Sequence, residues 1–146
     1  MESDSFTIRQ RDSYGGNRLP IKTILIEDNE LIRVNLIPAM EELANLEILA
    51  VTETEGSAIQ ILEEFAPIWE IVVVDLFLAE GSGMGVLKSC ASRLPHQKAY
   101  VLTNYPTPEM RRRCKELGAD GVFDKSNELD AFFDACLAWR PASPSS

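Results

Sequence analysis

Between residues 21 and 139, short apolar runs alternate with longer segments whose apolar positions recur at helical spacing. The runs predict five strands, at residues 24–26, 46–51, 71–75, 99–103 and 121–124, and a predicted helix follows each of them. Strands that are almost wholly apolar and are linked by helices indicate a parallel sheet covered on both faces. We therefore predict an α/β fold, a doubly wound, five-stranded, flavodoxin-like (βα)5 sheet with strand order 2-1-3-4-5.

The two ends of the chain lack this periodicity. Residues 1–20 are polar and contain a pair of glycines, and residues 140–146 combine two prolines with three serines. Such composition favours flexible tails, which leaves residues 21–139 as the predicted domain. The total length of 146 residues suits one domain with a buried core.

Two helix starts are indicated by capping residues. Asn29 is placed to cap a helix over residues 30–44, and the side chains predicted to face inward from it are Leu31, Val34, Leu36, Ile37, Met40 and Leu43. Thr52 and Glu55 have the spacing of a capping box for the next helix.

Composition and charge restrict the possible partners. The chain has 45% apolar and 25% charged residues, as ordinary globular proteins do, and its formal net charge of −9 argues against direct binding to nucleic acid. The basic group at residues 111–113 and 115 is interpreted as a solvated helix face rather than a docking patch. No apolar run is long enough for membrane insertion, and the N-terminus lacks the order of a secretory signal. The three cysteines are interpreted as buried thiols in a reducing cytoplasm.

Polar side chains with complementary groups (carboxylates, a hydroxyl and an ammonium) stand at the carboxyl ends of four predicted strands. Glu27 and Asp28 follow the first strand, Asp75 ends the third, Thr103 ends the fourth and Lys125 follows the fifth. Open parallel sheets bind their ligands at this edge. Three carboxylates that lie close together resist ionisation unless cations are supplied. Lys125 supplies one positive charge, and a hard divalent cation such as Mg²⁺ would supply the rest.

These groups fit the transfer of a phosphoryl group to a carboxylate. Asp75 is the candidate nucleophile, and a bound metal ion would neutralise charge on the incoming group. Thr103 can donate a hydrogen bond to one phosphoryl oxygen, and Lys125 can pair with another. Catalysis would then depend mainly on positioning and electrostatics.

With this arrangement the sequence resembles the response-regulator receiver domains of two-component systems, of the chemotaxis-regulator type, over about residues 22–139. The residues that carry the resemblance are Glu27, Asp28, Asp75 after three valines, Gly83, Thr103 and Lys125. The resemblance implies a stand-alone receiver in which Asp75 accepts the phosphoryl group and Lys125 and Thr103 bind it.

The resemblance also implies a metal site. Asp28 and Asp75 would bind Mg²⁺ (or Mn²⁺) directly, and Glu27 would act mostly through water. The backbone carbonyl of Phe77 would complete the ligands that the protein supplies.

Four positions depart from the family pattern. Ser126 follows Lys125 where most receivers have a proline, and Val122 stands where an aromatic switch residue is usual. The loop after the fifth strand is therefore expected to be less rigid, and the coupled motion of the threonine and the aromatic residue is expected to be weak or to take another form. Phe77 and Tyr105 carry rings where receivers often have small or polar groups. We expect these rings either to shield the acyl phosphate from water and slow its hydrolysis, or to form an apolar docking surface.

The expected function is a signalling switch that takes a phosphoryl group from a sensor histidine kinase or a histidine phosphotransfer protein. Its output would pass through an unknown partner protein, and it is not expected to be an enzyme that acts on separate substrates. The alternative is a receiver-like interaction module that is independent of phosphorylation. A phosphatase of the haloacid dehalogenase type is disfavoured because Phe77 stands where that class needs a second acid. A flavodoxin is disfavoured because the acidic turn after the first strand repels phosphate.

Overall fold

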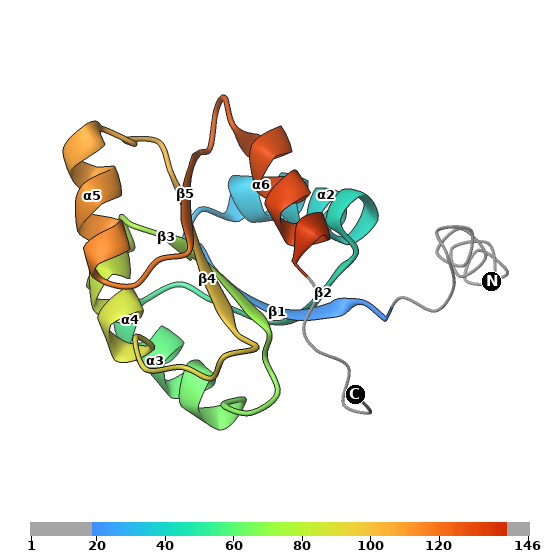
Figure 1. Cartoon of the computed structure of the whole chain (residues 1–146), viewed down its shortest axis with the longest axis horizontal. Coiled ribbons are helices and arrows are strands. Elements are labelled where there is room, and N and C mark those ends of the chain that lie inside the picture. Colours follow the sequence, from blue (N-terminus) through green and yellow to red (C-terminus); the bar gives the residue numbers. More distant parts are fainter. Residues whose placement is uncertain (1–18, 140–146) are drawn as a thin grey trace, which may run out of the picture.

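A parallel sheet forms the centre of the molecule, and the computed structural model describes residues 19–139 around it (Figure 1). Neighbouring strands all pair in parallel in the order β2-β1-β3-β4-β5, which confirms the predicted topology. The strands are β1 (Ile21–Ile26), β2 (Leu46–Thr52), β3 (Ile71–Asp75), β4 (Lys98–Thr103) and β5 (Gly121–Asp124). Apart from residues 19 and 20, the predicted tails lie outside the described residues, so the division into tails and domain stays a prediction.

Helices cover both faces of the sheet. They are α2 (Glu30–Ala44), α3 (Glu55–Glu64), α4 (Gly83–Ser89), α5 (Pro108–Glu116) and α6 (Leu129–Ala138). Helices α2 and α6 pack on one face, and α3, α4 and α5 pack on the other (Figure 1). In the described part of the chain, no helix has the length and apolar character needed to cross a bilayer.

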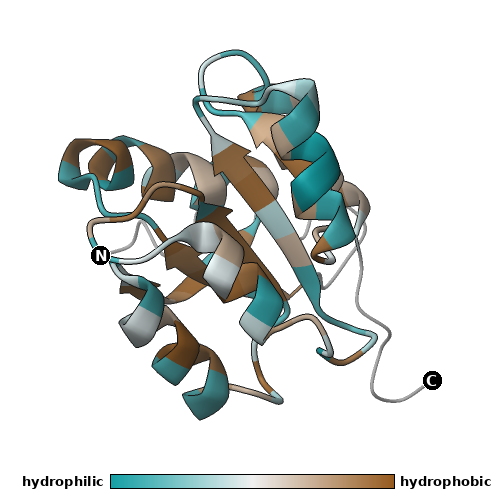
Figure 2. Ribbon diagram, turned by 90° about the vertical axis from the view of Figure 1, so that its left-hand side faces the viewer, coloured by the Kyte–Doolittle hydropathy of each residue, from teal (hydrophilic) through white to brown (hydrophobic). Residues whose placement is uncertain are grey.

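The strands separate two apolar clusters because alternate side chains of a strand point to opposite faces. Val72 and Val74 pack with α3, α4 and α5, whereas Ile71 and Val73 pack with α2 and α6. All five residues of β3 are buried, as expected for the central strand of a two-faced sheet. Apolar residues accordingly gather in the central strands, and hydrophilic residues colour the outer helical surfaces (Figure 2).

Helix α2 is rotated relative to the prediction. Its buried side chains are Leu36, Met40 and Ala44, which recur every four residues. Leu31, Val34 and Leu43 were predicted to face inward, but they are 70%, 61% and 57% exposed. The prediction was wrong because apolar residues occur around most of this helix, so periodicity alone could not select the face that meets the sheet.

The caps agree with the sequence at one helix and differ at the next. Asn29 caps α2, since its side chain accepts a hydrogen bond from the N–H of Ile32 at 3.0 Å. The capping box of α3 consists of Thr54 and Ser57, whereas Thr52 is the last residue of β2. The predicted pair of Thr52 and Glu55 was therefore wrong, and the Glu55 side chain has a different partner.

Candidate functional site

Glu27 and Asp28 lie at the carboxyl end of β1, at the edge where the strands β1, β3 and β5 end together. The N–H of Glu27 donates to the carbonyl of Thr52 at 2.9 Å, which ties this turn to β2. The Glu27 carboxylate is 2% exposed and accepts a hydrogen bond from the N–H of Asn29 at 3.1 Å. The guanidinium of Arg33 donates to the Glu27 carbonyl at 2.9 Å and holds the turn from its outer side.

Asp75 ends β3 beside these two acids. The residue is 7% exposed, and its Oδ1 accepts a hydrogen bond from the N–H of Phe77 at 3.4 Å. One carboxylate oxygen from each of Glu27, Asp28 and Asp75 lies within 4.8 Å of the others. The structure thus brings together the three acids that the sequence predicted to be neighbours.

Lys125 places its ammonium group between two of the acids. Its Nζ lies 2.7 Å from Oε1 of Glu27 and 3.4 Å from Oδ2 of Asp75, and its side chain is 9% exposed. The N–H of Lys125 donates to the carbonyl of Thr103 at 2.9 Å, so β4 fixes the backbone from which the ammonium reaches inward.

The surroundings of Asp75 disfavour its charged form. Burial is the largest influence and raises the pKa of Asp75, Lys125 lowers it, and Glu27 raises it again, with a net pKa of about 6. A hard divalent cation among the three carboxylates would relieve both the repulsion and the desolvation. The donor set consists of carboxylate oxygens, which are the ligands that such a cation prefers. The residues present therefore fit a divalent metal ion.

Thr103 and Tyr105 form the opposite wall of the site. Thr103 is completely buried, and its Oγ1 accepts a hydrogen bond from the N–H of Tyr105 at 3.0 Å. The hydroxyl proton of Thr103 therefore remains available for donation. The Tyr105 ring meets the Phe77 ring edge to face, with 5.4 Å between the centroids. These rings are 62% and 52% exposed, so they stand at the rim of the site.

Val122 stands at the position where the resemblance leads one to expect an aromatic switch residue. It is 6% exposed and packs in the apolar cluster on the α4 side of the sheet. Its carbonyl accepts a hydrogen bond from Arg111 at 2.8 Å. Arg111 also donates to the carbonyl of Pro106 at 3.1 Å and to Glu128 at 3.0 Å. The interpretation of residues 111–113 as a solvated face is therefore wrong for Arg111, which joins α5 to β5, and agrees with Arg112, whose side chain is 59% exposed.

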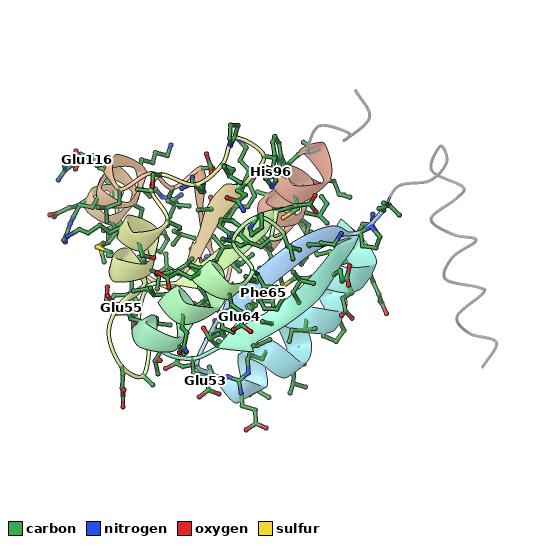
Figure 3. All side chains as sticks on the ribbon, turned by 90° about the horizontal axis from the view of Figure 1, so that it is seen from below. Glu53, Glu55, Glu64, Phe65, His96 and Glu116 are labelled. Atoms are coloured by element: carbon green, nitrogen blue, oxygen red, sulfur yellow. The ribbon has the colours of Figure 1, made fainter. Side chains whose placement is uncertain are left out.

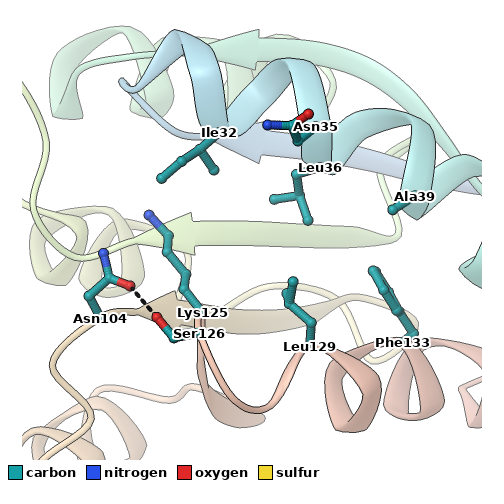
Figure 4. A pocket seen from close by; sticks show the side chains of 9 residues that line it. All are labelled: Ile32, Asn35, Leu36, Ala39, Asn104, Lys125, Ser126, Leu129 and Phe133. Atoms are coloured by element: carbon teal, nitrogen blue, oxygen red, sulfur yellow. Dashed lines mark hydrogen bonds between the residues drawn. The ribbon is translucent and has the colours of Figure 1, made fainter.

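A groove opens beside Lys125, between α2 and α6 (Figure 4). Ile32 and Leu36 line it from α2, Leu129 and Phe133 line it from α6, and its volume is about 300 Å³. Ser126 lies at the same end as Lys125, and its hydroxyl donates to Asn104 at 3.4 Å.

Sequence reasoning missed the residues that hold the site from outside, namely Arg33, Glu55 and Arg111. Arg33 and Arg111 each bond to backbone carbonyls and also pair with an acid, Glu53 and Glu128 respectively. Glu55 accepts from a backbone N–H of the loop after β3. A contact to a backbone group leaves no mark on the identity of the partner residue. The backbone contacts of these three residues therefore gave no sequence signal.

Comparisons with known proteins agree with this geometry. The family model described as the response regulator receiver domain matches residues 23–136. The photosynthetic apparatus regulatory protein RegA of Rhodobacter capsulatus is 28% identical over 121 residues, which cover 83% of this chain and 64% of RegA. The chain spans roughly half to two thirds of the length of the curated relatives that it matches.

Solved structures show the same fold. A LuxR-family two-component response regulator from Aurantimonas sp. SI85-9A1 aligns with a TM-score of 0.71 and 23% identity, over 86% of this chain and 91% of that one. A response regulator from Burkholderia pseudomallei, described with a phosphorylated aspartic acid, a calcium ion and citrate, aligns with a TM-score of 0.68 and 21% identity, over 81% and 67% of the two chains.

Proposed function

The chain belongs to the response regulator receiver domain family of two-component signalling, and from this premise we propose that Asp75 is its phosphoacceptor. The observation that carries the proposal is the setting of the Asp75 carboxylate. It is buried at the carboxyl edge of the sheet, 3.4 Å from the Lys125 ammonium and beside two further acids. A carboxylate in such a setting is poised to react once its charge is balanced.

In the proposed reaction, an oxygen of Asp75 forms a bond to phosphorus while the bond from phosphorus to a phosphohistidine nitrogen breaks. The imidazole leaves with the electron pair of that bond. Lys125 then pairs with a phosphoryl oxygen, a short shift from its present contact with Asp75. The hydroxyl of Thr103 donates to a second phosphoryl oxygen while its oxygen keeps the hydrogen bond from Tyr105.

We propose Asp28, Asp75 and the backbone carbonyl of Phe77 as the direct ligands of Mg²⁺ (or Mn²⁺), with Glu27 acting through water. When bound, the ion would neutralise charge between the carboxylates and the phosphoryl oxygens. The indirect role of Glu27 is supported by its existing contacts. One of its oxygens pairs with Lys125 at 2.7 Å, and the other accepts from the N–H of Asn29 at 3.1 Å.

The proposed partners are proteins. A sensor histidine kinase or a histidine phosphotransfer protein would deliver the phosphoryl group, and the apolar groove between α2 and α6 opens beside Lys125 where such a donor must approach. The output would pass to a further protein, without direct contact to nucleic acid and without membrane insertion. We propose a cytoplasmic location and a role as a switch that acts on no separate substrate.

The proposal is tested with beryllofluoride, which mimics a phosphoryl group on an aspartate. Beryllofluoride with Mg²⁺ is expected to raise the thermal stability of the wild type, and neither component alone should give the full shift. Asp75→Asn should abolish the shift. Asp134→Asn, on the exposed side of α6, is the matched control and should keep it. A wild type that does not respond would contradict the proposal.

The second candidate function is a receiver-like interaction module that is independent of phosphorylation. The observation in its favour is Val122, which is buried and fixed by Arg111 in place of a mobile aromatic residue. This candidate predicts no beryllofluoride response and equal partner binding by the wild type and Asp75→Asn. The complete set of Glu27, Asp28, Asp75 and Lys125 favours the phosphorylated switch.

A further inference from the structure

Glu55 is the first residue of α3, and it contacts the loop that follows Asp75. Its Oε1 accepts a hydrogen bond from the N–H of Ser82 at 2.9 Å, and its own N–H donates to the carbonyl of Glu80 at 3.0 Å. Figure 3 labels Glu55 and Glu64, which stand at the two ends of α3. The Glu55 end contacts the loop between β3 and α4.

Two glycines of that loop and of α4 make room for the Glu55 side chain. A Cβ atom on Gly81 would collide with the Cβ of Glu55, and one on Gly85 would collide with its Oε2. Gly81 also has a φ of +81°, which L side chains rarely adopt. The carboxylate is thus enclosed by backbone on the side of the loop.

The same loop is built directly onto the phosphoacceptor. Ser82, which donates to Glu55, forms a β-bridge with Phe77. The N–H of Gly83 donates to the carbonyl of Leu76 at 3.0 Å, and a Cβ on Gly83 would collide with the Asp75 carbonyl. A displacement of Ser82 is therefore transmitted to the backbone of Phe77 and Asp75.

We propose that Glu55 is a positioning residue for the metal and phosphoryl site, which holds the loop between β3 and α4 so that Phe77 and Asp75 keep a fixed relation before the metal ion binds. The inference rests on the proposed function, because Phe77 and Asp75 matter as ligands only if a metal ion binds there. Groups that orient direct ligands typically change metal affinity by about 10- to 100-fold when they are removed. Glu55 itself touches neither the metal ligands nor the phosphoryl group.

Glu55 could affect Mg²⁺ affinity through its negative charge or by positioning the loop, and two variants distinguish these cases. Glu55→Gln removes the negative charge but keeps an oxygen that can accept from Ser82, whereas Glu55→Ala removes both. If Glu55 positions the loop, Glu55→Ala should weaken Mg²⁺ binding by roughly tenfold and Glu55→Gln should restore most of the affinity. Glu64→Ala, an exposed change of the same charge at the other end of α3, should leave the affinity unchanged.

The measurements are the Mg²⁺ dissociation constant by calorimetry on the full chain and hydrogen exchange of the Ser82 amide without metal. The Ser82 amide should lose protection in Glu55→Ala and keep it in Glu55→Gln. The stability of each variant in EDTA is measured separately, so that a change in affinity is not mistaken for unfolding.

Gly85→Ala approaches the same contact from the other side. Alanine favours a helix over glycine, so this variant is expected to fold, yet its Cβ should displace the Glu55 carboxylate and weaken Mg²⁺ binding. In a Glu55→Ala background the same change should cost no further affinity.

Three results would overturn the inference. They are equal Mg²⁺ affinity in the wild type and Glu55→Ala, equal losses in Glu55→Ala and Glu55→Gln, and additive effects of Glu55→Ala and Gly85→Ala. Failure of the proposed function would be recognised separately, as a wild type that binds no Mg²⁺, and it would remove the inference as well.

Discussion

Asp75 is held by groups that oppose one another. Its burial raises the pKa, Lys125 at 3.4 Å lowers it and Glu27 raises it, so the carboxylate titrates near pH 6 in the metal-free protein. The folded pKa lies above the unfolded value near 4, and the folded state therefore binds the proton more tightly. The contribution of protonated Asp75 to the free energy of unfolding is therefore fully present below about pH 4, and it is lost as the pH rises through about 6.

Asp75→Asn is therefore expected to stabilise the metal-free protein at pH 7. Screening at the solvent-facing edge of the site reduces the effect to about 1–2 kcal/mol in the free energy of unfolding. Chemical denaturation in EDTA measures it, and the difference from the wild type should vanish near pH 4. A variant that is less stable than the wild type at pH 7 would show that the carboxylate is not repelled by its surroundings.

Lys125 has the converse role, because it neutralises a buried acid. Lys125→Met should lower the free energy of unfolding by about 3 kcal/mol in EDTA, since Glu27 would remain at 2% exposure without a counter-charge. Mg²⁺ should restore part of the loss. Lys115→Met, on the exposed surface of α5, is the control and should change stability little. Equal stability of the two variants would contradict this view of the ion pair.

At the scale of elements, strands were easier to predict than helices. The bounds of β3 and β5 agree with the predicted ranges, because continuous apolar runs bounded by polar residues define strands in a covered sheet. Helix α4 ends at Ser89, and the apolar Leu94 beyond it is 46% exposed. The face of α2 and the cap of α3 were wrong, since both depend on how the helix meets the sheet.

The loops after β3 and β4 carry the exposed pair of Phe77 and Tyr105. We predict that the rings shield the acyl phosphate from water, so that the phosphorylated state decays slowly. Phe77→Ala and Tyr105→Ala should each shorten its lifetime, measured by the loss of phosphoryl mass with time after the donor is removed. Ile68→Ala, an exposed change beyond the opposite edge of the sheet, should leave the lifetime unchanged. A lifetime of seconds that neither change alters would leave the rings as a docking surface.

For the molecule as a whole, the topology and the gathering of the candidate side chains at one edge of the sheet could be predicted from one sequence. Glu27, Asp28, Asp75, Thr103 and Lys125 all follow or end strands, and a parallel sheet brings strand ends together regardless of loop detail. The residues that hold the loops around the site, such as Glu55, could not be predicted. Glu55 accepts a hydrogen bond from Ser82, which lies 27 residues further along the chain. This contact becomes visible only when α3 is packed against the loop between β3 and α4.

The buried thiols and Tyr100 make a prediction about alkaline pH. Burial raises the pKa of Cys136 and of Tyr100 to about 12 each, above their unfolded values, so the folded state keeps these protons. The contribution of these two groups to the free energy of unfolding is present below about pH 9. It should fall by about 2–3 kcal/mol by about pH 10.5, because the thiol and the phenol ionise in the unfolded chain. Cys136→Val should flatten this decline in denaturation curves. The same slope in both proteins would contradict the assignment to Cys136.

The site of phosphorylation tests the role of Asp75 most directly. The full chain is incubated with Mg²⁺ and acetyl phosphate, and intact and peptide masses are measured for the wild type and Asp75→Asn. We predict the gain of one phosphoryl group, placed on Asp75, dependent on Mg²⁺ and absent from the variant. A wild type that gains no phosphoryl group, or an Asp75→Asn variant that gains one equally, would show that Asp75 is not the phosphoacceptor.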